Sequence, residues 1–224
     1  MKGIAKIVSA VLCGLFITSC GLDNYDEPQS TLEGRVVYNN QPVYVRGTSD
    51  AVQLQLYQDG YEKRDPISVY VTQDGSFSAI LFDGQYKLIT RSGNGPWLSS
   101  TDTLTVNVNG YTTVDLPVTP YFTLTGENFS LNGNQVTGTA TVTKVVETSS
   151  ITSALLLVSK TAFVDEATYL ARQEVTEVSE GNLSMSLDLT GNADAASAAS
   201  LYARIGVKPA EADQYVYTPV VQIK

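Results

Sequence analysis

One stretch, residues 72–88, constrains the fold of this chain more than any other. Every second residue from 77 to 81 is apolar, which gives one mainly apolar face, and apolar and polar side chains alternate over residues 85–88; both have the period of two of a β-strand. Asp74-Gly75 precedes the first alternating segment, and Asp83-Gly84 joins it to the second. An Asp-Gly pair between two such segments predicts a β-hairpin, because glycine and aspartate tolerate the positive φ angles of a tight turn.

The same alternation recurs along the whole first half of the chain. It predicts seven short strands, at residues 32–38, 52–57, 67–71, 77–82, 86–91, 104–108 and 114–118. The segment 39–42 is a turn, and Asn109-Gly110 predicts a second hairpin between the last two strands. About seven strands with turns between them indicate a β-sandwich over residues 31–119.

Pro120 marks the boundary to a second domain, residues 120–224, because proline cannot continue a ladder inside a sheet. Strands are predicted at residues 122–129, 135–146, 154–158, 183–189, 201–207 and 215–223. The segment 154–158 is apolar on both faces, so we expect it to be the central strand. The pattern again indicates a sandwich, of the immunoglobulin or fibronectin kind, and the fold class is all-β with two tandem sandwiches.

Two details of the second domain lead to further expectations. Phe163, Ala167 and Leu170 stand near helical spacing, which predicts a short helix over residues 163–171. In the strand 201–207, Arg204 alternates with apolar residues and is assigned to the polar face.

Composition excludes several classes of function. The 224 residues include no histidine, and the two cysteines fall within the first twenty residues. A mature chain without these residues has no Ser-His or Cys-His nucleophile and almost no ligands for zinc, so we expect no enzyme activity, metal site or cofactor. The net charge of −9 argues against binding of nucleic acid, whose phosphates an acidic surface repels.

The first residues have the pattern of a bacterial lipoprotein signal. Lys2 and Lys6 precede an apolar core, residues 7–17, that is too short to span a bilayer comfortably. The segment Ile17-Thr18-Ser19-Cys20 resembles a lipobox, although lipoboxes prefer leucine where Ile17 stands. The resemblance implies that residues 1–19 are removed and that Cys20 is acylated, which would anchor the chain to a membrane. An ordinary secretory signal is the alternative.

Residues 20–30 form a polar, acidic segment that we expect to be a flexible tether. Its acidic residues resemble the surface-export signal of Bacteroidetes lipoproteins. We therefore expect an outer-membrane protein displayed on the cell surface, with the periplasmic face as the alternative.

Three short motifs of the first domain resemble a known fold family. They are Gly34-Arg35-Val36, Asp74-Gly75-Ser76-Phe77 and Gly84-Gln85-Tyr86-Lys87-Leu88. Together they are similar to the carboxypeptidase regulatory-like domain, a transthyretin-like sandwich. With the lipobox and the second β domain, the chain resembles a two-domain family of Bacteroidetes outer-membrane lipoproteins associated with polysaccharide-utilisation systems. This resemblance implies no catalytic residues.

A glycine-rich loop, residues 92–98, carries Trp97, the chain's only tryptophan. An exposed indole can stack on a sugar ring, and Tyr44, Tyr61 and Tyr111 fall near loops where they could join it in a binding surface. The alternative is that Trp97 closes the end of the sandwich or packs on the second domain.

The expected function is therefore non-catalytic: capture of an extracellular polysaccharide, or assembly with outer-membrane uptake proteins. The alternative is a structural or adhesion module that binds a protein partner, which a long unpaired edge strand would favour. A hydrolase would need two carboxylates facing each other across a cleft, about 5–9 Å apart.

Overall fold

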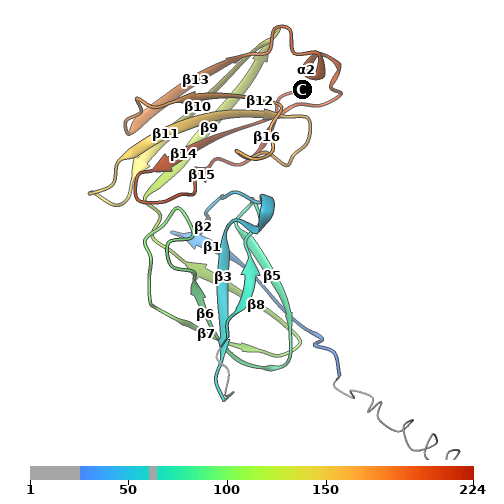
Figure 1. Cartoon of the computed structure of the whole chain (residues 1–224), viewed down its shortest axis with the longest axis vertical. Helices are drawn as coiled ribbons and strands as arrows, with labels where there is room; N and C mark the ends of the chain where they lie inside the picture. Colours follow the sequence, from blue (N-terminus) through green and yellow to red (C-terminus); the bar gives the residue numbers. More distant parts are fainter. Residues whose placement is uncertain (1–25, 61–64) are drawn as a thin grey trace, which may run out of the picture.

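The computed structural model describes residues 26–60 and 65–224, and the expectations for Cys20 and Tyr61 lie outside these ranges. The described chain forms two tandem β-sandwiches stacked end to end, as Figure 1 shows. The expected all-β class is confirmed.

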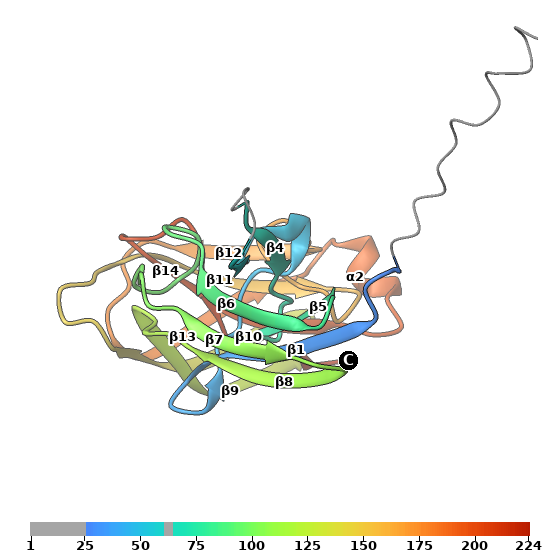
Figure 2. The ribbon, with the colours of Figure 1, turned by 90° about the horizontal axis from the view of Figure 1, so that it is seen from below.

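The first sandwich consists of two four-stranded sheets. Its strands are β1 (Ser30–Tyr38), β2 (Gln41–Pro42), β3 (Gln53–Gln58), β4 (Ile67–Tyr70), β5 (Ser76–Leu81), β6 (Gly84–Thr90), β7 (Leu104–Val108) and β8 (Tyr111–Pro117). β1 lies at the centre of one sheet, where it pairs antiparallel with β2 and β5 and parallel with β8. Figure 2 shows β1 between β5 and β8. The other sheet has the order β4-β3-β6-β7.

Both hairpins predicted from Asp-Gly and Asn-Gly pairs are wrong. β5 pairs with β1, whereas β6 pairs with β3 and β7, so Asp83-Gly84 carries the chain from one sheet to the other. Asn109-Gly110 does the same between β7 and β8. An Asp-Gly or Asn-Gly pair indicates that the chain reverses direction. Which strands then pair with each other depends on how the side chains pack across the sandwich. The carboxylate of Asp83 binds the Ser30 hydroxyl and the Gly110 N–H instead of closing a hairpin.

The motif glycine Gly34 is required by the close approach of β8. A Cβ atom built at Gly34 would lie 1.7 Å from the carbonyl oxygen of Val114 and 2.6 Å from Cζ of Phe77. Only glycine lets β1 pass between its parallel partner and the aromatic ring that fills the core.

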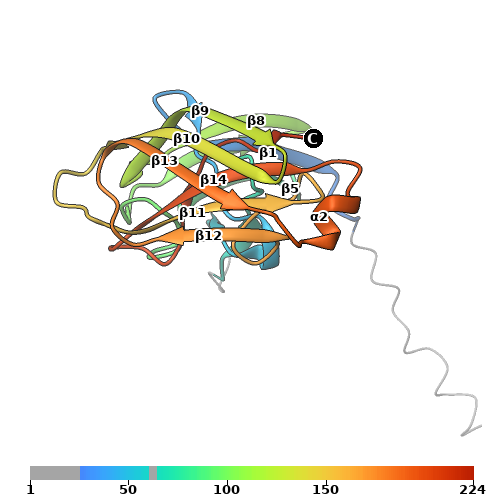
Figure 3. The same cartoon turned by 90° about the horizontal axis from the view of Figure 1, so that it is seen from above.

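The second sandwich faces a three-stranded sheet against a larger one (Figure 3). Its elements are β9 (Phe122–Asn132), β10 (Gln135–Lys144), β11 (Ile151–Ser159), β12 (Ala171–Val175), β13 (Gly181–Asp188), α2 (Ala193–Ser197), β14 (Tyr202–Pro209), β15 (Val216–Tyr217) and β16 (Val221–Gln222). The order of the smaller sheet is β13-β10-β9. In the larger sheet β11 lies between β12 and β14, which confirms the expected central strand. Leu155, Leu156 and Leu157 are all fully buried there.

The helix predicted over residues 163–171 is wrong. The chain instead makes a tight turn in which Asp165 and Thr168 exchange two backbone hydrogen bonds. The carboxylate of Asp165 accepts the N–H groups of Ala167 and Thr168 at 3.0 Å, and this side-chain arrangement competes with helix formation. The short helix of this domain is α2, which Asn192 caps by accepting the N–H of Ala195.

Candidate functional site

The joint between the sandwiches is held by a buried arginine. Arg204 on β14 is fully buried, and its guanidinium donates to the carbonyl oxygens of Thr218 at 2.9 Å, Val164 at 3.0 Å and Gln73 at 3.0 Å. It also lies over the Tyr217 ring, 4.1 Å from the centroid. Burial lowers the pKa of Arg204 to about 10, against the opposing attraction of nearby acidic groups. Because Gln73 belongs to the first sandwich, this side chain ties the two domains together.

A second set of polar contacts joins the segment 162–168 to the first sandwich. The buried Asp165 accepts the backbone N–H of Thr48 at 3.1 Å and its hydroxyl at 2.9 Å. The amide of Gln73 donates to the carbonyl of Ala162 at 2.6 Å and accepts the N–H of Val164 at 3.2 Å.

An ion pair completes these contacts. Arg46 lies 3.2 Å from the carboxylate of Glu166, which also accepts the hydroxyl of Tyr217. A joint with so many satisfied buried polar groups fixes the relative orientation of the sandwiches.

Beside this joint lies a cleft of about 370 Å³ with walls from both sandwiches. The turn between β1 and β2 forms one wall, and the first half of β9 together with β15 forms the other. The lining residues are Tyr38, Asn39, Gln41, Pro42, Val43, Tyr44, Pro120, Phe122, Thr123, Leu124, Thr125, Gly126, Glu127, Val216, Tyr217 and Pro219.

Local sequence explains both walls of this interdomain cleft. Asn39 and Asn40 have φ angles of 50° and 62°, which asparagine tolerates, and they close a two-residue turn between Tyr38 and Gln41. On the opposite wall Gly126 has φ 63° at a β-bulge, where the register of β10 against β9 shifts between Thr139 and Thr141. A bulge bends its strand, so β9 changes direction where it passes the cleft.

The cleft combines apolar and polar groups in a way that suits a polyhydroxylated ligand. Phe122 and Tyr217 are buried beneath it, and Tyr38 and Tyr44 are half-buried in its wall. Amides at Asn39 and Gln41, threonine hydroxyls and the carboxylate of Glu127 supply hydrogen-bonding groups. No lysine or arginine is among the described residues that line it.

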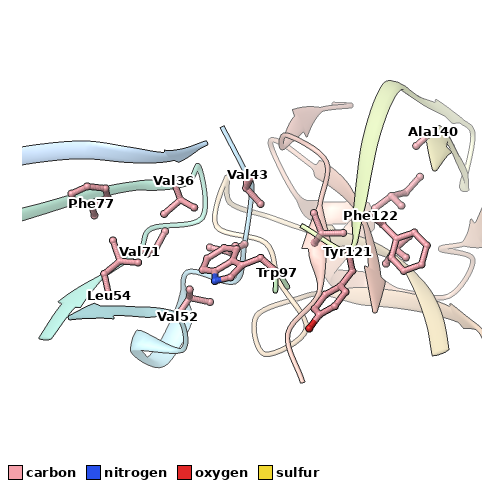
Figure 4. Packing of buried hydrophobic residues seen from close by; sticks show 14 of the residues in the cluster. Val36, Val43, Val52, Leu54, Val71, Phe77, Trp97, Tyr121, Phe122 and Ala140 are labelled. Carbon is pink, nitrogen blue, oxygen red and sulfur yellow. The ribbon is translucent and has the colours of Figure 1, made fainter. Parts of the chain in front are cut away.

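Trp97 does not belong to a binding surface, which corrects the sequence-based expectation. Its indole is only 3% exposed and lies in the core with Val43, Val52 and Tyr121, between the two sandwiches (Figure 4). A Cβ at Gly95 would lie 2.3 Å from Cε2 of Trp97. The glycine in this loop therefore lets the indole pack inward, which is the alternative left open by the sequence.

Backbone contacts around Trp97 extend the joint. Trp97 pairs with Pro120, Leu98 donates its N–H to the carbonyl of Thr119 at 2.9 Å, and Tyr121 donates to that of Pro96 at 3.1 Å. The loop thus pairs with the chain where it passes into the second sandwich.

The structure does not bring Tyr44 and Tyr111 together. Tyr44 lines the interdomain cleft, but Tyr111 lies at the opposite end of the first sandwich, 68% exposed, with its hydroxyl bound to Glu33. Tyr38 and Glu127, which also line this cleft, were not predicted from the sequence. Tyr38 stands directly before the Asn39-Asn40 turn, the same loop-flanking position that selected the other tyrosines.

Two other hollows are less suited to a ligand. A groove of about 470 Å³ on the first sandwich is lined by residues 98–104 and 116–119 and by Thr90, whose buried hydroxyl has no hydrogen-bond partner. A shallow depression of about 730 Å³ lies on the outer face of the β1 sheet, where Arg35 and Asp115 pair at 2.7 Å. Neither presents an accessible aromatic face among its described lining residues.

Within residues 26–60 and 65–224, no three His, Cys, Asp or Glu side chains are grouped to hold a metal ion. The helices described there are too short or too polar to cross a membrane.

These observations define a class of protein: two β-sandwiches fixed by a buried polar joint, with a cleft between them. Two family models match the chain, "Protein of unknown function (DUF3823) N-terminal domain" over residues 30–119 and "Domain of unknown function (DUF3823_C)" over residues 122–222. The chain belongs to the DUF3823 family.

Solved structures agree with this assignment. A DUF3823 family protein from Parabacteroides merdae is 49% identical, with 89% of this chain and 100% of that chain covered and a TM-score of 0.86. One from Bacteroides ovatus is 32% identical, with 87% and 98% covered and a TM-score of 0.79. A Bacteroides uniformis protein described as a "putative carbohydrate binding protein" shares the fold at 19% identity, with 88% and 100% covered and a TM-score of 0.74. No curated protein matches the chain.

Proposed function

We propose that this protein is a non-catalytic accessory protein that captures a neutral glycan in the interdomain cleft. The observation that carries the proposal is the cleft itself, where half-buried tyrosines meet amides, hydroxyls and one carboxylate. Sugar rings present an apolar face and a rim of hydroxyls, so a site that binds them needs both kinds of group. The Bacteroides uniformis protein of the same fold, described as a "putative carbohydrate binding protein", supports this choice.

The single carboxylate among the described residues of the cleft supports a binding role. Glu127 is the one acidic residue among the described residues that line it. Hydrolysis of a glycosidic bond by the common mechanisms needs two carboxyl groups on either side of that bond. One carboxylate can accept hydrogen bonds from sugar hydroxyls, but it cannot also supply the second carboxyl group that these mechanisms use as base or nucleophile.

The charge of the residues that line the cleft favours neutral over acidic glycans. The cleft offers a carboxylate and no cation among its described lining residues, and the chain carries a net charge of −9. Uronate or sulfate groups would be repelled, and no arginine or lysine would compensate for their desolvation. The ligand is therefore uncharged along most of its length.

The location proposed for this activity is the outer membrane. Acylation at Cys20 would hold the protein by a lipid anchor, with the acidic segment 21–29 as a short tether. On the cell surface such a protein would present glycan to uptake proteins of a polysaccharide-utilisation system. If the protein faced the periplasm instead, it would receive glycan after the uptake proteins had carried it across the outer membrane.

The test is electrophoretic retardation of the chain from Gln29 to Lys224 in gels that contain polysaccharides. One set holds neutral glucans, mannans and galactans, and the other holds pectins, alginate and glycosaminoglycans. We expect retardation by at least one neutral polymer and by none of the acidic ones. Retardation by acidic polymers alone would contradict the charge argument, and no retardation by any polymer would contradict glycan capture.

The structure also offers an observation for the alternative, a protein partner. β9 is 11 residues long and pairs only with β10 among the described strands, so one edge is free beyond the bulge at Gly126. The unpaired edge of β9 beyond Gly126 can accept a strand from another chain. Recovery of a specific outer-membrane protein with the wild type but not with Ser130→Pro, which places a proline in this edge strand, would favour this second function.

A further inference from the structure

The three most exposed large apolar side chains of the described residues lie at one end of the molecule. Tyr111 is 68% exposed, Ile80 65% and Phe82 49%, and the remaining exposed large apolar residues reach at most 43%. We call Ile80, Phe82 and Tyr111 the end patch. It lies where β1 begins, whereas the opposite end of β1 leads into the turn that lines the interdomain cleft.

Strand register shows that the end patch is one surface. Thr31 on β1 pairs with Ile80 on β5 and with Tyr111 on β8, so these two side chains flank β1 on the outward face. Neighbouring strands are about 4.8 Å apart, which places the two Cα atoms roughly 10 Å from each other. Phe82 follows β5 directly, two residues after Ile80, and its side chain is exposed.

The polar groups around the end patch are bound within the protein. The carboxylate of Asp83 accepts from the Ser30 hydroxyl and from the N–H of Gly110. The Tyr111 hydroxyl donates to Glu33, which leaves the tyrosine ring as the exposed part of the side chain. The patch therefore presents apolar surface beside two carboxylates, Asp83 and Glu33, that have partners within the protein.

The chain enters the first sandwich at the same place. β1 begins at Ser30, one residue before the row that Thr31 shares with Ile80 and Tyr111. Nine residues separate Cys20 from Ser30, and an extended chain spans at most about 3.6 Å per residue, so an acyl group on Cys20 would keep this end within roughly 35 Å of the lipid.

From this we infer that the end patch rests on the lipid surface and orients the molecule. The inference depends on the lipid anchor in the proposed function. Tyrosine and large aliphatic side chains favour the boundary between head groups and acyl chains. Contact there fixes which face of the first sandwich is turned toward the membrane. Three side chains bind lipid too weakly to hold the protein without the anchor, so their role is orientation.

The experiment uses the full acylated chain, purified in detergent and reconstituted into phosphatidylcholine vesicles with brominated acyl chains. Tyr111→Trp reports on the end patch, and Tyr169→Trp, which is 42% exposed on the second sandwich, is the matched control. Trp97 is buried and gives both variants the same background. We expect bromine to quench the added fluorescence of Tyr111→Trp and to leave Tyr169→Trp at its level in unbrominated vesicles. Adding Ile80→Ser and Phe82→Ser should reduce the quenching of Tyr111→Trp.

Other outcomes overturn the inference. Absence of quenching in Tyr111→Trp means that the end patch does not touch lipid, and equal quenching of both variants means that the molecule has no preferred orientation. Mass spectrometry of the Cys20 peptide reports acylation separately. An acylated but unquenched chain contradicts the orientation alone, whereas a chain without acyl groups contradicts the anchor and the orientation with it.

Discussion

Arg204 in the second sandwich donates a hydrogen bond of 3.0 Å to the backbone carbonyl of Gln73 in the first, across 131 residues of sequence. Gln73 lies in the turn before β5, the stretch whose alternation defines the first sandwich. A buried guanidinium bound to three carbonyl oxygens cannot shift without leaving buried polar groups unpaired. The two sandwiches therefore behave as one body, and the interdomain cleft keeps its shape in the absence of ligand.

Replacing this arginine should destabilise the protein strongly. In Arg204→Met the apolar stem is kept, but three carbonyl oxygens lose their hydrogen-bond donor and Asp165 loses a nearby positive charge. Breaking a buried charged network in this way costs about 3–5 kcal/mol. Urea denaturation should show this loss in the free energy of unfolding. Arg172→Met, at an exposed ion pair, should change it by less than about 1 kcal/mol.

Stability should fall at alkaline pH because of Tyr217. Burial, and then the neighbouring Glu166, raise the pKa of Tyr217 well above its ordinary value of 10. A group whose pKa is higher in the folded state stabilises the fold below its unfolded pKa, and this contribution is lost as the pH rises through the folded pKa. The stability difference between wild type and Tyr217→Phe should thus be constant below about pH 10 and shrink above it. A difference that grows above this pH would contradict the assignment.

Trp97 should matter for stability and not directly for ligand binding. Trp97→Ala removes a large side chain from the core between the sandwiches, and such truncations cost about 3–5 kcal/mol. Trp97→Phe keeps part of the packing, so it should fold and bind glycan as the wild type does. Loss of glycan binding in a stably folded Trp97→Phe variant would contradict this and would indicate that Trp97 contributes to the binding site.

Gly34 and Gly110 should respond to alanine for different reasons. Gly34→Ala forces a Cβ atom against the Val114 carbonyl, so β1 and β8 must separate, and we expect a loss of more than about 3 kcal/mol. Gly110 has open space but a φ of 61°, so Gly110→Ala should cost only about 1–2 kcal/mol. Equal losses, measured by thermal unfolding, would mean that the close approach at Gly34 relaxes easily.

The strands could be predicted from the sequence because alternation is a local property. Residues 154–158 are apolar on both faces, and β11 is the buried central strand of its sheet for that reason. The pairing partners of β5 and β8 could not be predicted. Asp83-Gly84 and Asn109-Gly110 indicate where the chain reverses, but they do not determine which strand lies next to it.

Burial of polar and aromatic residues depends on distant segments. Arg204 alternates with apolar residues as a solvent-facing side chain would, but the segment 162–168 and the ring of Tyr217 cover it. Trp97 stands in a loop typical of exposed residues, yet its indole fills the joint. The cleft is made by two domains, so no local pattern could have located it.

The most direct test of the account is calorimetric titration of Tyr38→Ala and Tyr169→Ala with a neutral oligosaccharide that the wild type binds. Tyr38 lines the interdomain cleft, and Tyr169 is an exposed tyrosine outside it. We predict that Tyr38→Ala raises Kd at least about tenfold, which corresponds to about 1.4 kcal/mol, and that Tyr169→Ala leaves Kd unchanged. Thermal unfolding of each variant confirms that it is folded at the temperature of the titration. An unchanged Kd in folded Tyr38→Ala would contradict the claim that the interdomain cleft binds the glycan.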